Sequence, residues 1–391
     1  MMWMNIFYMK WKRKKAMAKI DPGFKNKILK YGAEEFTACY NCGNCTAVCN
    51  LTEKDTTFPR KYIRYGVLGL KEEIVRSREL WMCYGCGDCS ETCPRGADPA
   101  SYMAALRRYT IANYDITGIT RLIFTNRYFA LSLTIILAVI LGFFLLTLKP
   151  ESHVSRWIFQ YMSYEIIHNM GIIIFAILGI TIVVGVTRMI LSLNKNEDPE
   201  IRKKVNSVIK SFLFVFNELG SMHRQKVCDS EDDSVWEGKP GYKKPWFLHY
   251  SIMWGFIGLL VATTLDFIFK DPATKVWLPS RILGTLAGLF MMYGSTILIY
   301  YRLIKISKFL ANTRWTDIYF LVFLWLAGFT GFWLEVSVTL GSDNLINHIV
   351  FILHTVISME LVLLFTFSKF AHAIYRPVAL FFQYYRYGSA I

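Results

Sequence analysis

The chain has 391 residues, of which 54% are hydrophobic and 19% are charged, and this composition excludes a purely soluble protein. The formal net charge of +15 comes mostly from lysine and arginine beside the apolar segments, as expected for the cytoplasmic loops of a membrane protein. These basic residues form no groove-reading motif, which argues against nucleic-acid binding.

Residues 1–20 form a basic extension that mixes Met, Trp and Phe with five basic residues between Lys10 and Lys15. A cleavable secretory signal has the opposite order, with its charges before its apolar core. Two interpretations stay open for this extension. It lies on the membrane surface or against a partner, or it is a disordered tail.

Residues 21–115 are predicted to form a ferredoxin-like domain, because the spacing C-x2-C-x2-C-x3-C occurs in them twice. Two-residue spacers let successive sulfur atoms point inward from one short loop, so each run can surround a [4Fe-4S] cluster. Eight of the nine cysteines lie in these runs, and Cys228 lies alone. The first run contains Cys39, Cys42, Cys45 and Cys49, and the second contains Cys83, Cys86, Cys89 and Cys93.

Disulfides or zinc fit these cysteines less well. Disulfides need an oxidising compartment, and a zinc site usually takes its ligands in two separate pairs. In two-cluster ferredoxins the fourth cysteine of each run binds the other cluster. This rule predicts that Cys93 joins the first three cysteines of the first run and that Cys49 joins those of the second. The first run departs from the usual pattern, because Asn50 stands where Pro94 follows the second run.

Between the two runs, residues 61–83 carry apolar side chains at helical spacing, and Gly66 and Gly69 mark a break. This pattern predicts a helical hairpin. The ferredoxin-like domain is therefore expected to be helical between its cysteine loops.

Six apolar spans follow, and each is long enough for a bilayer core that needs about 20 helical residues. Only helices can satisfy the backbone groups of such spans in lipid. The predicted fold is therefore all-α: a helical two-cluster domain followed by a six-helix transmembrane bundle over residues 120–391. The spans are predicted at 125–148, 164–190, 247–270, 282–304, 316–340 and 346–374.

Lysine and arginine are concentrated in the connections after the second and fourth spans, whereas the other connections are short and poor in charge. This asymmetry predicts a multi-pass protein of the cytoplasmic membrane with the ferredoxin-like domain and both termini in the cytoplasm. The long connection at about 191–246 contains an amphipathic stretch at residues 205–220. A helix lying at the membrane face and a docking surface for soluble partners both stay open for it.

A cluster domain beside a membrane bundle raises the question of what carries electrons into the lipid, and a haem held by paired histidines is the usual carrier. Histidines inside membrane spans are costly and therefore indicate function. His249 opens the third span after basic residues, and His372 lies between Lys369 and Arg376, so both are expected at the cytoplasmic edge. These two histidines form the predicted inner haem pair.

His354 precedes His372 on the last predicted span by about five helical turns, so both are expected on one face near opposite leaflets. By elimination, His168 is the predicted partner of His354 at an outer haem, although a single haem also stays open. His348 lies about 1.7 turns before His354 and is expected to point away from that haem. The candidate quinone or proton contacts near the outer face are Tyr164, Glu165, Asp343 and His348.

The double cysteine motif resembles the ferredoxin-like C subunits of heterodisulfide reductases. The spans from about 164 to 376 resemble the cytochrome b family of nitrate reductase gamma subunits and heterodisulfide reductase E subunits. This resemblance rests on His249 within FLHYSIMWGF and on the pair His354 and His372. The gamma subunits have a second histidine where this chain has Leu259.

The combination of both halves in one chain resembles the membrane subunits of quinone-interacting membrane-bound oxidoreductase (Qmo) complexes. This resemblance implies menaquinone as substrate, two b haems and flavoprotein partners related to heterodisulfide reductase A. It also implies electron supply to adenylylsulfate reductase in dissimilatory sulfur metabolism. The chain would then be a quinone-interacting oxidoreductase subunit that is active within a complex.

Three alternatives stay open. Electrons can run in reverse, from reduced soluble partners to a quinone. The chain can instead serve another soluble partner, as in a heterodisulfide reductase-like or sulfite-pathway module. A different class of function is a membrane anchor whose clusters are structural and whose histidines bind no haem.

Overall fold

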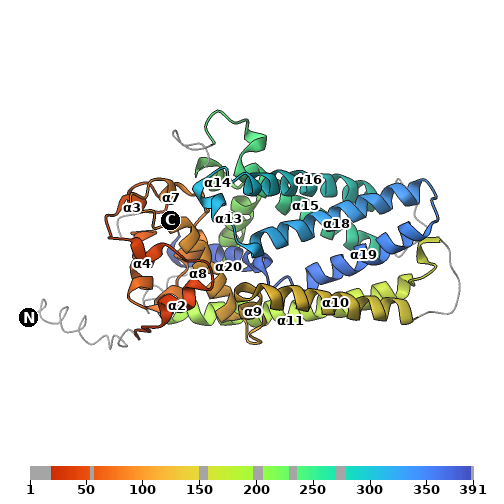
Figure 1. Cartoon of the computed structure of the whole chain (residues 1–391), viewed down its shortest axis with the longest axis horizontal. Helices are drawn as coiled ribbons and strands as arrows, with labels where there is room; N and C mark the ends of the chain where they lie inside the picture. The colour runs from red at the N-terminus through yellow and green to blue at the C-terminus, as the bar shows by residue number, and fades with distance from the viewer. Residues whose placement is uncertain are drawn as a thin grey trace, which may run out of the picture.

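A small helical domain lies at one end of an elongated helix bundle in the computed structural model (Figure 1). The basic extension up to residue 18, the acidic run at 229–233 and the side chain of Cys228 lie outside the described part of the chain. The part of the chain that the structure describes contains helices and no strand, so the predicted all-α fold is confirmed. The described residues are 19–52, 57–148, 157–196, 206–228, 236–269 and 279–388.

The amino-terminal domain is built around its longest helix, α8, against which its shorter helices pack. Tyr62, Trp81 and Tyr102 are almost fully buried in its core. Between the cysteine runs, described residues 57–82 contain the short helices α4, α5 and α6, and Gly69 at a φ of 71° separates α4 from α5. The helices are α2 (Phe24–Leu29), η1 (Phe36–Ala38), α3 (Asn44–Ala47), α4 (Arg60–Val67), α5 (Lys71–Val75), α6 (Glu79–Met82), α7 (Asp88–Glu91), α8 (Pro99–Tyr114) and α9 (Ile119–Thr125).

Six helices of the bundle are long and apolar enough to cross a membrane. They agree with the predicted spans to within a few residues at most ends. Glycines let α15 and α16 approach closely, because a Cβ added at Gly255 would lie 2.6 Å from the backbone nitrogen of Met291. The six helices are α10 (Arg127–Thr147), α11 (Tyr164–Asn196), α15 (Pro245–Phe269), α16 (Pro279–Leu303), α18 (Trp315–Thr339) and α19 (Leu345–Leu363).

The last predicted span, 346–374, is wrong at its carboxyl end. The helix α19 stops at Leu363, and a turn and the short helix η4 (Lys369–Ala371) separate it from α20 (His372–Tyr387). Aromatic packing explains the break, because the rings of Phe365 and Phe370 stack with centroids 4.8 Å apart. On one continuous helix these two side chains would point about 140° apart. His354 and His372 therefore do not share a helix.

The long connection before α15 contains α13 (Val208–Ser221) and α14 (His223–Cys228). The helix α13 packs against α20 and leaves an apolar stripe exposed, including Ile209, Phe212 and Phe216. This stripe matches the predicted amphipathic helix. Three short elements complete the described connections: η2 (Trp157–Phe159), η3 (Gly241–Lys243) and α17 (Lys308–Ala311).

Candidate functional site

Both cysteine runs fold through the same turn. In each run a glycine in the left-handed region, Gly43 with a φ of 95° and Gly87 with a φ of 101°, precedes a four-residue helix. Only glycine adopts this conformation without strain. The glycine after the second cysteine of each run therefore turns the chain so that the third cysteine lies on the helix that follows.

The structure gathers cysteines from both runs around Cys45. Burial, together with the neighbouring Cys39, Cys42 and Cys93, raises the pKa of the Cys45 thiol to about 11. These four are the set predicted for one cluster, although their ligation stays a prediction. Backbone N–H groups also point at this set, since Ala97 donates to the Cys93 sulfur at 3.4 Å. Such bonds stabilise thiolates and tune the potential of a cluster.

A second group forms around Cys89. Burial raises the pKa of its thiol well above the ordinary value, and the charges of Cys83, Cys49 and Cys45 add to this effect. Cys49 and Cys45 of the first run thus both lie near Cys89, and the exchange of fourth cysteines stays a prediction. No three described His, Cys, Asp or Glu side chains lie close enough together to hold a single metal ion. Cysteines of a cubane cluster bind different iron atoms and lie further apart.

The membrane bundle covers the second run. A Cβ added at Gly87 would lie 3.1 Å from Cβ of Phe309, which belongs to α17 between α16 and α18. On the same helix, the backbone N–H of Lys308 donates to the Glu91 carboxylate at 2.7 Å. Arg107 of α8 donates to the backbone carbonyl of Cys83. The second run is therefore enclosed between α8 and a loop of the bundle.

The predicted inner histidines lie together at this end of the bundle. The rings of His249 on α15 and His372 on α20 have centroids 6.0 Å apart. Nδ1 of His372 donates to the backbone carbonyl of Lys369 at 2.5 Å, so its Nε2 carries no proton in the neutral ring. Nδ1 of His249 is buried and has no hydrogen-bond partner. Both imidazoles thus have nitrogen atoms available to a ligand.

Positive charges surround the histidine pair and connect it to the second run. Burial, together with the charges of Lys369, Arg107 and Arg376, lowers the pKa of His372 to about 4. The Arg376 guanidinium also lies 4.5 Å from the ring centre of Tyr84, the residue after Cys83. One arginine side chain therefore bridges the histidine pair and the second cysteine run.

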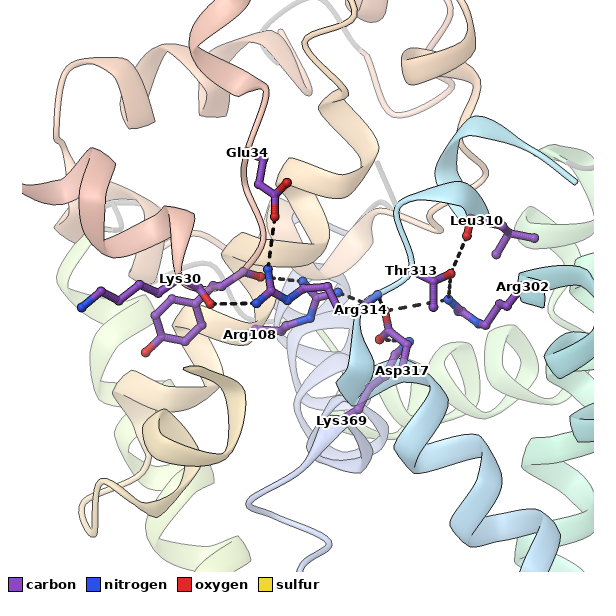
Figure 2. A network of polar contacts seen from close by, with 10 residues as sticks. Lys30, Glu34, Arg108, Arg302, Leu310, Thr313, Arg314, Asp317 and Lys369 are labelled. Atoms are coloured by element: carbon purple, nitrogen blue, oxygen red, sulfur yellow. Dashed lines mark hydrogen bonds and ion pairs between the residues drawn. The ribbon is translucent and has the colours of Figure 1, made fainter. Parts of the chain in front are cut away.

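A buried acid ties the two parts of the molecule together (Figure 2). Asp317, near the start of α18, is 4% exposed and accepts a hydrogen bond from Lys369 Nζ at 2.8 Å. Its other oxygen lies 3.3 Å from the guanidinium of Arg108 on α8 and 3.8 Å from that of Arg302 on α16. One carboxylate thus balances cations from the ferredoxin-like domain and from the bundle.

The same network reaches the first residues of the domain (Figure 2). Arg108 also donates to the backbone carbonyl of Tyr31 at 2.7 Å. Arg314 donates to the carbonyl of Lys30 at 3.1 Å and lies 3.8 Å from the Glu34 carboxylate. The segment at residues 30–34 is therefore held against the start of α18.

The two histidines predicted to bind an outer haem contact different neighbours, unlike the inner pair. His354 lies against α18, where its Nδ1 bonds to the Thr330 hydroxyl at 2.9 Å and its ring packs over Gly331. His168 lies on α11 with its ring centroid 5.6 Å from that of Tyr164. The ring of His354 is turned to α18, and its pairing with His168 stays a prediction.

The candidate outer quinone contacts form two groups. His348 is 5% exposed, its Nε2 lies 2.9 Å from the Asp343 carboxylate, and its ring packs on Trp157 and Tyr161. Tyr164 contacts Phe159, and Glu165 is exposed.

Sequence reasoning missed Asp317, Arg107 and Phe309, because single residues without a repeated spacing carry no signal. It also missed the buried Glu360 on α19, although an acid inside a predicted span is itself a signal.

Comparison with known proteins gives the cysteine region a family. Residues 35–97 match the 4Fe-4S dicluster domain. A segment of 76 residues is 40% identical to the C subunit of the H(2):CoB-CoM heterodisulfide,ferredoxin reductase of Methanothermobacter thermautotrophicus, covering 19% of this chain and 41% of that protein. The iron-sulfur C subunit of the CoB–CoM heterodisulfide reductase of Methanopyrus kandleri is 41% identical over 70 residues, 18% of this chain and 36% of its own.

A protein of Archaeoglobus profundus that is described as similar to the heterodisulfide reductase C subunit is 34% identical over 90 residues, 23% of this chain and 48% of its own length. The chain thus spans less than half the length of these curated relatives. No solved structure matches it. The amino-terminal part of the chain therefore carries a 4Fe-4S dicluster domain that is related to the iron-sulfur C subunits of heterodisulfide reductases.

Proposed function

We propose that the chain is the membrane electron-transfer subunit of an oxidoreductase complex, which passes electrons between the menaquinone pool and cytoplasmic flavoprotein partners. The domain over residues 21–115 would hold two [4Fe-4S] clusters, and the bundle over residues 120–391 would hold b haem. Bound clusters and haems would supply one-electron carriers whose potentials depend on their ligands and burial.

The observation that carries the proposal is the pair of His249 and His372 beneath the second cysteine run. A metal held at about 2 Å by one nitrogen of each ring puts the ring centroids roughly 6 Å apart, and the measured separation is 6.0 Å. The bond from His372 Nδ1 to a backbone carbonyl orients its ring as in other metal-binding histidines. Arg107 and Arg376 are suited to pair with haem propionates.

The remaining site residues follow the predictions from the sequence. We propose His168 and His354 as ligands of a second haem, and Tyr164, Glu165, Asp343 and His348 as quinone or proton contacts. The proposed ligands of one cluster are Cys39, Cys42, Cys45 and Cys93, and those of the other are Cys83, Cys86, Cys89 and Cys49.

The relatives of the cysteine region are heterodisulfide reductase subunits, which supports heterodisulfide reductase A-like flavoproteins as partners. The resemblance of the whole chain to the membrane subunits of Qmo complexes extends the proposal to adenylylsulfate reductase as electron acceptor. The excess of lysine and arginine in the loops at the cluster end supports a cytoplasmic location for that end.

The test is the optical spectrum of the full-length protein, purified with its clusters and reduced with dithionite. We expect a b-type α band, and we expect His249→Ala and His372→Ala each to remove the same component of it. His223→Ala, on the exposed helix α14, is the matched control and leaves the band unchanged. A spectrum without a b-type band would contradict haem binding and favour the membrane-anchor alternative.

A further inference from the structure

A crevice lies where the ferredoxin-like domain meets the inner ends of α18 and α19. Its walls come from α9, the first turns of α18, the last turn of α19 and residues 368–370. The crevice is open on one side. Six of its thirteen lining residues are aromatic: Phe124, Trp315, Tyr319, Phe320, Phe323 and Phe370.

One acid in this crevice has no partner. Glu360, in the last turn of α19, is 1% exposed, and its buried Oε1 makes no hydrogen bond. Burying a polar group without a hydrogen bond is costly, and ionisable residues inside membrane helices indicate function. Among the other polar groups of the wall, the Tyr319 hydroxyl bonds to Thr134 and Lys369 bonds to Asp317, whereas the buried Thr316 hydroxyl makes no hydrogen bond either. Glu360 is therefore the acid of the wall whose carboxyl oxygen lacks a hydrogen bond.

The chemistry of the crevice selects its occupant. A lipid acyl chain would fill the apolar walls but would leave Glu360 without a hydrogen bond. A planar quinone ring satisfies both features, because it stacks on aromatic side chains and its oxygen atom bonds to a carboxyl group. Its isoprenoid tail would leave through the open side of the crevice.

The position of the crevice supports the same occupant. Its wall includes Lys369, whose backbone carbonyl accepts the hydrogen bond from His372. Phe370, also in the wall, packs with its ring centroid 4.9 Å from that of Phe256 on α15, the helix of His249. The crevice therefore adjoins the inner histidine pair. By contrast, the candidate outer contact His348 lies about 18 Å along α19 from Glu360.

We propose that this crevice is a binding site for a lipophilic quinone, with Glu360 as the hydrogen-bonding partner of the quinone oxygen. The site would lie in the leaflet on the side of the clusters, separate from the outer contacts proposed above. The inference rests on the proposed use of quinone by this chain, and it adds where the quinone ring binds.

The experiment is photolabelling of the full-length, cluster-loaded protein in lipid nanodiscs with an azido-naphthoquinone that carries a prenyl tail, followed by peptide mapping. We expect label in residues 315–323 and 360–370, displaced by excess menaquinone. Label confined to 157–168 and 343–351 would overturn this site and leave the proposed function standing. If menaquinone displaces no label anywhere, the proposed function fails as well. Label at the crevice that menaquinone does not displace would mean a lipid site.

Variants test the role of the acid. Loss of one hydrogen bond to the quinone in Glu360→Leu should raise about tenfold the menaquinone concentration needed for displacement. Glu360→Gln retains a donor and should keep near-normal displacement. The matched control is Glu335→Leu, which removes another membrane glutamate at the end of α18 away from the crevice. Because Glu360→Leu could misfold, Phe323→Trp narrows the crevice independently, and cluster iron content reports folding. If Glu360→Leu and Phe323→Trp both leave unchanged the menaquinone concentration needed for displacement, the proposal is contradicted.

Discussion

The two cysteine runs share one turn geometry but have different surroundings. In the first run Cys42 is exposed, and the neighbouring Tyr40 is 58% exposed. In the second run the cysteines are partly buried, and Phe309 of the bundle lies over the glycine of the turn. Nearly the same local sequence therefore builds one centre that faces solvent and one that faces the bundle.

This difference indicates which run would face the soluble partner and which would face the membrane in the proposed electron path. The second run adjoins Arg376 and the histidine pair, whereas the first run presents its surface to the solvent. A soluble partner would thus approach the first run, and the membrane cofactors would lie nearest the second. Substitutions at each run test this difference.

The largest expected effect comes from the cysteine exchanged between the runs. In Cys93→Ser we expect iron to fall from about eight to about four atoms per chain, because one [4Fe-4S] cluster is lost. Iron analysis and electron paramagnetic resonance of the reduced protein measure this. The signal lost should be the one lost in Cys39→Ser, and Cys83→Ser should remove the other. If Cys93→Ser and Cys83→Ser remove the same signal, the exchange of fourth cysteines is wrong.

A smaller effect is expected where the two parts of the molecule join. Asp317→Asn leaves the buried Arg108 and Arg302 and the partly exposed Lys369 without their acid. Breaking a buried ion network from one side costs about 3–5 kcal/mol. Thermal unfolding in detergent should show this destabilisation. Limited proteolysis should cut the chain faster at the junction. Glu35→Gln, at an exposed carboxylate, is the control for acid loss alone. Equal stability of the two variants would contradict the role of the network.

The smallest effect is expected at the cover of the second run. Phe309→Ala uncovers the turn at Gly87, with a stability loss of about 1–2 kcal/mol. Air oxidation should bleach the second cluster severalfold faster. The electron paramagnetic resonance signal of that cluster measures the rate. Tyr40→Ala, at the exposed first run, should leave both bleaching rates nearly unchanged. Similar bleaching in the two variants would show that the bundle does not shield the second run.

Local patterns in the sequence predicted the helical fold and the spans well, because hydrophobic length and cysteine spacing are local properties. The last span failed because apolar composition continues past Leu363, while the stacking of Phe365 on Phe370 depends on tertiary packing. The inner histidines lie close together although the apolar pattern placed His372 on the wrong helix. Asp317 carried no signal, since its partners come from remote segments.

The Asp317 network has a consequence for the speed of electron transfer. Electron tunnelling slows exponentially with the gap between carriers, so a flexible tether between the domain and the bundle would spread that gap over many values. Asp317 joins α8, α16, α18 and η4 through charges that are costly to separate. In the proposed electron path, the buried acid would thus act as a spacer that keeps the tunnelling distance constant.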